Sequence, residues 1–240
     1  MENKVIHKSE NRGQADHGWL KAKHSFSFAS YYNPSQMHFG VLRVLNDDEI
    51  APGKGFGTHP HDNMEIITIP LEGALEHKDN MGNNGVIKYG DVQVMSAGSG
   101  VMHSEFNASK TERVKLFQIW LYPDKENVKP RYDQVSLNVS DRKNKLQTIV
   151  SPDTENNGIW IHQQAWFSMG SFDKDKEVNY KIRKQGNGVY AMVVKGEFSI
   201  NNDTLKERDA IGIWNTDKLQ IVSKTEGAEI LLMDIPMQLN

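Results

Sequence analysis

The chain has 240 residues, of which 38% are hydrophobic and 25% charged, an ordinary balance for a globular protein that buries a core. Its formal net charge of -3 offers no overall attraction for a phosphate backbone, which argues against a nucleic-acid partner. The absence of cysteine excludes disulfides, zinc–thiolate sites and thiol nucleophiles, so any transition-metal site must use imidazole and carboxylate ligands.

The opening stretch MENKVIHKSENRGQ is polar and lacks the apolar core of a signal peptide. No run along the chain approaches the length of a transmembrane helix. We therefore expect a cytoplasmic protein that has no membrane partner.

Short runs rich in Val, Ile, Phe and Tyr recur along the chain. They predict β-strands within residues 38–45, 65–71, 85–95, 113–122, 189–200, 219–223 and 229–235. Polar turn sequences lie between them, at 46–48, 79–82, 186–188 and 201–203. Regular short strands of this kind are typical of barrels and sandwiches, and no helical period is sustained. The predicted fold class is all-β, with few short helices.

The middle of the chain, residues 123–145, is charged, contains two prolines and has few large apolar residues. Such a composition is typical of a connection between domains, and the near-equal halves favour two domains, 1–130 and 131–240. A single domain with one long surface loop is the alternative. A faint repeat supports two domains, because Glu72-Gly73 and Lys195-Gly196 each close a predicted strand before a hairpin.

The residues that carry chemistry lie in the first half. His59 and His61 are two positions apart, and so are His103 and Glu105. Residues i and i+2 of a strand point the same way, so each pair can enter one barrel interior. A lone His-x-His occurs by chance on surfaces, but a second pair some forty residues later argues against chance. Three nitrogens and one carboxylate oxygen suit Fe, Mn, Cu, Ni or Zn better than Ca or Mg.

These motifs resemble those of the cupin superfamily. The first cupin motif is matched by Gly53, His59, His61, Glu65 and Gly73, and the second, more loosely, by Gly90, Gly98, His103 and Asn107. More narrowly, RGQADHGWLKAKHSFSFASYYNP, HPHDNMEIITIPLEG and GDVQVMSAGSGVMHSE resemble the pirins, including bacterial pirins with quercetinase activity. The likeness is specific over residues 12–122 and weak beyond. It implies a bicupin of two tandem β-barrel (jelly-roll) domains, of which only the N-terminal one binds metal.

The resemblance also implies that Glu105, rather than Glu65, completes the ligand set of His59, His61 and His103. Strand geometry agrees, because Glu65 lies roughly 13 Å beyond His61 along an extended strand. Glu65 is then expected to orient a histidine from outside the ligand set or to lie at the barrel mouth. No ligand pair is found in the second half, where His162 is expected to pack or to form a hydrogen bond.

The remaining histidines and aromatic residues receive no metal role. No partner at ligand spacing accompanies the other five histidines, which are His7, His17, His24, His38 and His77. Four aromatic residues are expected in the core, with one or two lining a cavity for a flat ligand: Trp19, Phe26, Phe28 and Phe39.

The pirin resemblance implies a metal-dependent dioxygenase of the quercetin 2,3-dioxygenase type. Such an enzyme opens the flavonol heterocycle with O2 and releases carbon monoxide, and Glu105 would accept the substrate proton. One divalent transition metal per chain is expected, first of all Fe(II), with Cu, Ni, Mn, Co or Zn as alternatives. The expected partners are O2 and a flavonol or other enolic or catecholic compound, bound by a monomer. The competing function is a non-enzymatic, iron-dependent redox sensor that acts through protein partners.

Overall fold

A computed structural model describes residues 2–154 and 158–239 of the chain. Strands dominate it, and the helical segments in these residues are two short 3-10 turns, η1 (Ser9–Asn11) and η2 (Val139–Arg142). The prediction of an all-β fold with few short helices is confirmed. Within the described ranges, no helix has the length and apolar character needed to cross a membrane.

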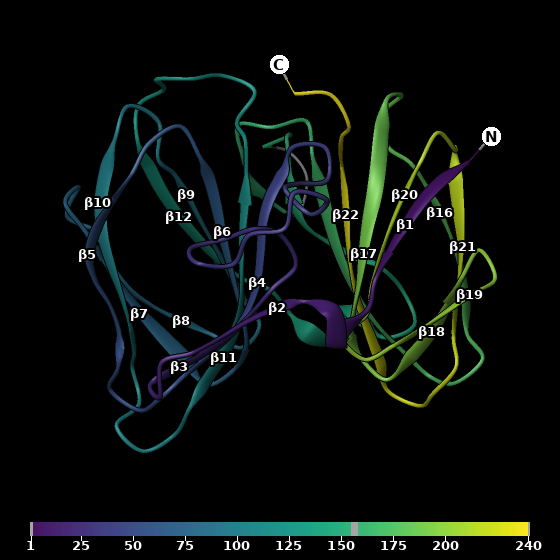
Figure 1. The fold of residues 1–240 in the computed structure, drawn as a ribbon, viewed down its shortest axis with the longest axis horizontal. Helices are drawn as coiled ribbons and strands as arrows, with labels where there is room; N and C mark the ends of the chain where they lie inside the picture. The colour runs from purple at the N-terminus through teal and green to yellow at the C-terminus, as the bar shows by residue number, and fades with distance from the viewer. Residues whose placement is uncertain (1, 155–157, 240) are drawn as a thin grey trace.

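The first barrel consists of a seven-stranded sheet and a four-stranded sheet (Figure 1). The larger sheet has the order β12-β9-β6-β11-β4-β3-β2 and the smaller one β5-β10-β7-β8. Their bounds are β2 (Gly13–Asp16), β3 (Leu20–His24), β4 (Leu42–Ile50), β5 (Gly55–His61), β6 (Glu65–Glu72), β7 (Ala74–Asp79), β8 (Asn84–Lys88), β9 (Asp91–Ser96), β10 (Val101–Asn107), β11 (Val114–Leu121) and β12 (Arg131–Ser136).

The second barrel repeats this plan with sheets of the order β1-β20-β17-β22-β15-β13-β14 and β16-β21-β18-β19. Its strands are β1 (Asn3–His7), β13 (Gln147–Ser151), β14 (Ile159–Trp160), β15 (Trp166–Phe172), β16 (Glu177–Lys181), β17 (Asn187–Lys195), β18 (Glu197–Ile200), β19 (Asp203–Lys206), β20 (Ala210–Trp214), β21 (Lys218–Ser223) and β22 (Ala228–Pro236). The tandem-barrel architecture matches the predicted one.

Two strands cross the predicted division between residues 130 and 131. β1 pairs with β20, so the start of the chain completes the edge of the second barrel's larger sheet. β12 pairs with β9, so residues 131–136 extend the first barrel. The ranges 1–130 and 131–240 stay a prediction about domains, but the sheets themselves exchange strands across that boundary.

The two seven-stranded sheets pack face to face across the middle of the molecule (Figure 1). One apolar cluster takes Phe117 and Ile67 from the first barrel and Phe167 and Leu231 from the second. Tyr190 of the second barrel lies 5.4 Å from Phe39, measured between ring centroids. Because one face of each large sheet is used for this contact, side chains on the other face fill the interior of their own barrel.

The alternation of β10 gives the first barrel its polar interior. His103 and Glu105 are buried, whereas the intervening and following side chains are more exposed. β5 runs beside β10, and a Cβ atom on Gly55 would lie 2.1 Å from the backbone oxygen of Glu105. Only glycine fits so close a crossing. The β5–β10 pair therefore brings both predicted motifs to one place.

Candidate metal centre

Three of the four predicted ligands converge in the first barrel. His103 of β10 lies directly opposite His59 of β5 in the antiparallel register. The ring centroid of His59 is 4.4 Å from that of His103 and 4.8 Å from that of His61, and the His61–His103 separation is 4.9 Å. The three imidazoles can therefore share one ion.

Glu105 lies on β10, two positions after His103. A register irregularity in β10 separates His103 from Glu105 where the strand pairs with β5. Glu105 is buried, and its Oε2 atom accepts a hydrogen bond of 2.9 Å from Nε2 of Gln118. The oxygen of the same Gln118 amide accepts from Thr68 Oγ1 at 3.1 Å, which fixes the orientation of the amide. Gln118 thus holds the carboxylate through Oε2, while Oε1 has no hydrogen-bond partner among the described residues.

Potential ligand atoms fall into two overlapping groups. One group contains His59, His61 and His103, and the other contains His103, Glu105 and His77, with ligand atoms within 4.8 Å of one another in each. The predicted set of four is therefore brought to one region but divided between two groups that share His103.

His77 is the residue that the sequence interpretation missed. It was expected to have no partner at ligand spacing, but that prediction was wrong, because its ring centroid lies 5.2 Å from that of His103. Its Nε2 atom is 3.2 Å from Oδ2 of Asp79, and both side chains are fully buried. The His-x-Asp spacing at 77 and 79, on one face of a strand, was the available signal. Only the pairing of β7 with β10 places it at the site.

Burial determines the charge state of these groups. Desolvation, with the charges of the neighbouring histidines, lowers the pKa of His103 to about 2 and that of His61 to about 4. Desolvation raises the pKa of Glu105 to about 7, although the bond from Gln118 acts in the opposite direction. Both imidazoles are therefore neutral at pH 7, which is the form that binds a metal ion.

The donor set fits a divalent transition metal. Among the described residues, His103 Nε2 and Glu105 Oε1 are buried atoms that have no hydrogen-bond partner. Leaving such atoms unpaired is costly, and a cation bound by imidazole nitrogen and carboxylate oxygen would satisfy both.

A mainly apolar cavity of about 460 Å³ opens on these ligands. Its aromatic and aliphatic walls come from Trp19, Phe28, Phe56, Ile66 and Trp120, and its polar lining includes Asn46, Asp48 and Gln118. Trp19 and Phe28 thus line a cavity as expected, whereas Phe26 and Phe39 belong to the core between the barrels. The volume lies in the range of small-molecule sites, roughly 300–1,000 Å³.

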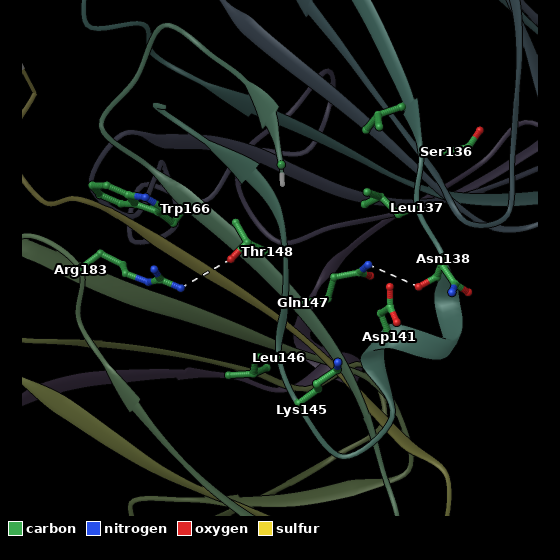
Figure 2. Close-up of a pocket in the computed structure, with 12 residues that line it drawn as sticks. Ser136, Leu137, Asn138, Asp141, Lys145, Leu146, Gln147, Thr148, Trp166 and Arg183 are labelled. Carbon is green, nitrogen blue, oxygen red and sulfur yellow. Dashed lines mark hydrogen bonds between the residues drawn. The ribbon is translucent and has the colours of Figure 1, made fainter. Parts of the chain in front are cut away.

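A larger hollow of about 840 Å³ lies between the barrels, where η2, β13 and Arg183 meet (Figure 2). Its lining is polar, with Gln147 bonded to the backbone oxygen of Asn138 and Trp166 at one side. The described residues that line it include no histidine and no group of potential metal ligands. The smaller cavity is therefore the candidate site.

Glu65 belongs to the contact between the barrels. Its Oε2 atom accepts hydrogen bonds from Ser96 Oγ at 2.8 Å and from the backbone nitrogen of His162 at 3.2 Å. The alternation of β6 places Ile66 at the cavity and Glu65 on the opposite face, so it neither orients a ligating histidine nor lies at the barrel mouth. The His162 ring packs on Trp160 at 4.4 Å, as expected.

Comparisons with known proteins match both halves of the chain to known families. The Pirin family model matches residues 5–121, and the model of the quercetinase C-terminal cupin domain matches residues 148–235. The quercetin 2,3-dioxygenase of Escherichia coli (strain K12) is 42% identical over 231 residues, which cover 96% of this chain and 98% of that protein. A pirin-like protein of Caulobacter vibrioides is 42% identical over 223 residues, 92% of this chain and 95% of its own.

Two solved structures superpose on this chain over nearly its whole length. The bacterial pirin YhhW from Escherichia coli, in complex with nickel(II), superposes with a TM-score of 0.92 at 40% identity, covering 98% of this chain and 99% of its own. A quercetin 2,3-dioxygenase from Acinetobacter baumannii superposes with a TM-score of 0.80 at 20% identity, covering 99% and 88%, and shares the fold.

Proposed function

Because this chain belongs to the pirin family of two-domain cupins, we propose that it is a metal-dependent dioxygenase that opens the heterocycle of flavonols with O2 and releases carbon monoxide. The observation that carries the proposal is the position of the His59, His61, His103 and Glu105 cluster at one wall of a mainly apolar, aromatic cavity. A flat, enolic substrate fits such a cavity with its polar edge toward the ligands.

The metal site follows from the neutral imidazoles and the buried carboxylate. We propose that His59, His61, His103 and Glu105 hold one divalent ion per chain in the first barrel, Fe(II) in the native protein. Nickel(II) in the related bacterial pirin supports a single divalent ion. Such an ion supplies Lewis acidity that lowers the pKa of an enolic hydroxyl beside it.

The chain's own groups position the substrate and move its proton. Oε2 of Glu105 is held by Gln118, and Oε1 would serve the ion; as a ligand that could loosen, Glu105 would be the base that accepts the proton of the substrate hydroxyl. Burial raises the pKa of Glu105 above its ordinary value, which makes the carboxylate a stronger base. Trp120, whose ring lies 4.9 Å from that of His61, and Phe56 flank the flat substrate and exclude water.

The direct test measures oxygen uptake and carbon monoxide release with a panel of flavonols and other enolic compounds, on protein loaded separately with Fe(II), Ni(II), Cu(II), Mn(II), Co(II) or Zn(II). We expect stoichiometric O2 consumption and carbon monoxide formation with a flavonol. Absence of turnover with every metal and every enol would overturn the proposal of a dioxygenase and favour that of a metal-dependent regulatory protein. Gel filtration tests the further proposal that the protein is a monomer, and cell fractionation tests its place in the cytoplasm.

A further inference from the structure

A second buried carboxyl group, Asp48, lines the cavity beside the candidate metal centre. It lies on β4, opposite Leu116 of β11 and Ala22 of β3. Leu116 and Ala22 belong to an apolar cluster in the first barrel, and Asp48 itself is only 4% exposed. An acid in such a place costs free energy unless it has a partner.

Asp48 has an oxygen atom to spare. Among the described residues, its Oδ1 atom is buried and has no hydrogen-bond partner. Asp48 is also absent from both groups of potential metal ligands. Neither the fold nor the proposed metal site therefore uses this oxygen.

The other oxygen atoms of the cavity wall are already occupied. The side-chain oxygen of Asn46 is 2.8 Å from Nδ1 of His24, and that of Gln118 accepts from Thr68. Of the carboxyl and amide oxygens that line the cavity in the described chain, Oδ1 of Asp48 and Oε1 of Glu105 are the buried ones left unpaired. Since Glu105 Oε1 serves the metal and the substrate proton, Asp48 is left for another part of a ligand.

Asp48 and Glu105 line one cavity from different strands, β4 and β10. Gln118, which holds Glu105, is two residues from Leu116 on β11, so Asp48 is its diagonal neighbour across β4 and β11. Asp48 lines the same cavity as Glu105 but belongs to neither group of potential ligand atoms. A ligand whose enol edge is at Glu105 can therefore present another part of its ring system to Asp48.

We propose that Asp48 is a specificity-determining residue that hydrogen-bonds a ligand hydroxyl group other than the one at the metal-binding edge. The cavity then prefers flat aromatic enols that carry such a hydroxyl over analogues that lack it. This inference rests on the proposed function, because it takes the ligand to be a flavonol-like enol at the metal centre.

The charge state of Asp48 supports this role. Burial, helped by the charges of Asp47 and Glu105, raises the pKa of Asp48 to about 8. This shift favours the protonated acid, which can donate to a hydroxyl oxygen or accept from the hydroxyl itself. A neutral partner also avoids a buried unpaired charge when the cavity is filled.

The test measures binding rather than turnover. Nickel(II)-loaded protein is titrated without oxygen with three flavonols, and the visible absorption of the bound flavonol is followed. The probes are 3-hydroxyflavone, which has no further hydroxyl, galangin, which has two on the fused ring, and kaempferol, which adds one on the pendant ring. Asp48→Leu removes the hydrogen bond at similar volume, and Asp48→Asn retains it. Asp48→Ala replaces the Leu variant if that variant fails to load nickel.

We expect the wild type to bind at least one hydroxylated probe more tightly than 3-hydroxyflavone. The ratio of the affinity for that probe to the affinity for 3-hydroxyflavone should fall about 5- to 100-fold in Asp48→Leu, which is the range expected when a buried polar group loses its hydrogen-bond partner. Most of the ratio should be retained in Asp48→Asn. The nickel content should not change. Equal ratios in the wild type and Asp48→Leu would overturn this inference alone. If no probe binds to the loaded wild type, the proposed function fails, and this inference fails with it.

Discussion

Nδ1 of His103 lies 3.5 Å from Nδ1 of His77, so the central imidazole of the candidate metal centre is backed by a second imidazole. Nε2 of His77 lies in turn 3.2 Å from Oδ2 of Asp79. Asp79 is fixed by the backbone nitrogen and the side-chain amide of Asn83. If His103 uses its unpaired Nε2 for the metal, the proton on Nδ1 points to His77, and the chain from His103 to Asp79 fixes the tautomer of both rings.

This arrangement predicts that Asp79→Asn weakens metal binding without abolishing it. Outer partners of ligating histidines are typically worth ~10–100-fold in metal affinity, and we expect a loss in that range. Competition titration with nickel(II) and a chelator measures it. His7→Phe is the matched control, since His7 is a buried histidine bonded to Tyr190 outside the site, and it should leave the affinity unchanged.

The ligand set can be tested against its alternative, in which His77, His103 and Glu105 hold the ion without His59 and His61. We expect His77→Phe to retain metal with reduced affinity. A His77→Phe variant that binds none, beside a His61→Phe variant with wild-type affinity, would contradict the proposed set and favour the group of His77, His103 and Glu105.

Replacing Glu105 by Gln should lower turnover far more than metal content. The change keeps the size of the side chain but removes its basicity, and general-base contributions are typically ~10²–10⁴-fold. Oxygen uptake with a flavonol, normalised to bound metal, gives the measurement. Glu65→Gln is the matched control, because Glu65 bonds Ser96 and His162 instead of the ligands, and its normalised rate should equal that of the wild type. Equal losses in both variants would remove the case for Glu105 as the base.

Elemental analysis should find one divalent metal per chain, held in the first barrel. Both groups of potential ligands found in the described residues lie there and share His103. His103→Ala should therefore lose the ion, because either group needs that nitrogen. Two tightly bound ions per chain, or full metal content in the variant, would refute the single site.

Glu65 should make the stability of the protein depend on pH. Desolvation raises its pKa from the ordinary value of 4.5 to about 7 in the folded state. Between these two values the folded protein holds a proton on Glu65 that the unfolded chain releases. The contribution of protonated Glu65 to the free energy of unfolding is therefore fully present at low pH and is lost as the pH rises from 4.5 through 7. Between pH 5 and pH 8 the free energy of unfolding of the wild type should fall about 2 kcal/mol more than that of Glu65→Gln. Denaturant titrations of the metal-free proteins at both pH values measure the difference. A parallel pH dependence in the two proteins would contradict it.

The spacing of His59 and His61, and of His103 and Glu105, was sufficient to predict that these side chains lie near one another in the first barrel, because side-chain parity within a strand is a local property. His77 could not be found in this way, since its place depends on which strand β10 adopts as its second neighbour, a pairing of residues distant in sequence. Asp48 was missed because residues 46–48 were predicted to form a turn; that prediction was wrong, since they lie within β4 (Leu42–Ile50).

The face on which Glu65 lies depends on the second barrel. β6 is apolar on both sides, with Ile66 at the cavity and Ile67 in the core between the barrels, so its pattern alone does not show which face meets the metal. The pairing of β1 with the second barrel and of β12 with the first likewise depends on contacts between residues distant in sequence. Composition indicated a boundary near residue 130, but edge pairing determines where each strand is placed.

The crossing of β1 into the second barrel has a thermodynamic consequence. A cut at residue 130 would deprive each barrel of an edge strand and expose the face that carries Phe117 on one side and Tyr190 on the other. We therefore expect the chain to unfold as one cooperative unit. An ion that binds only the folded state stabilises everything that unfolds with its site, by RT ln(1 + [L]/Kd). The melting temperature of the second barrel should thus rise with the metal concentration, although the proposed ion binds to the first barrel.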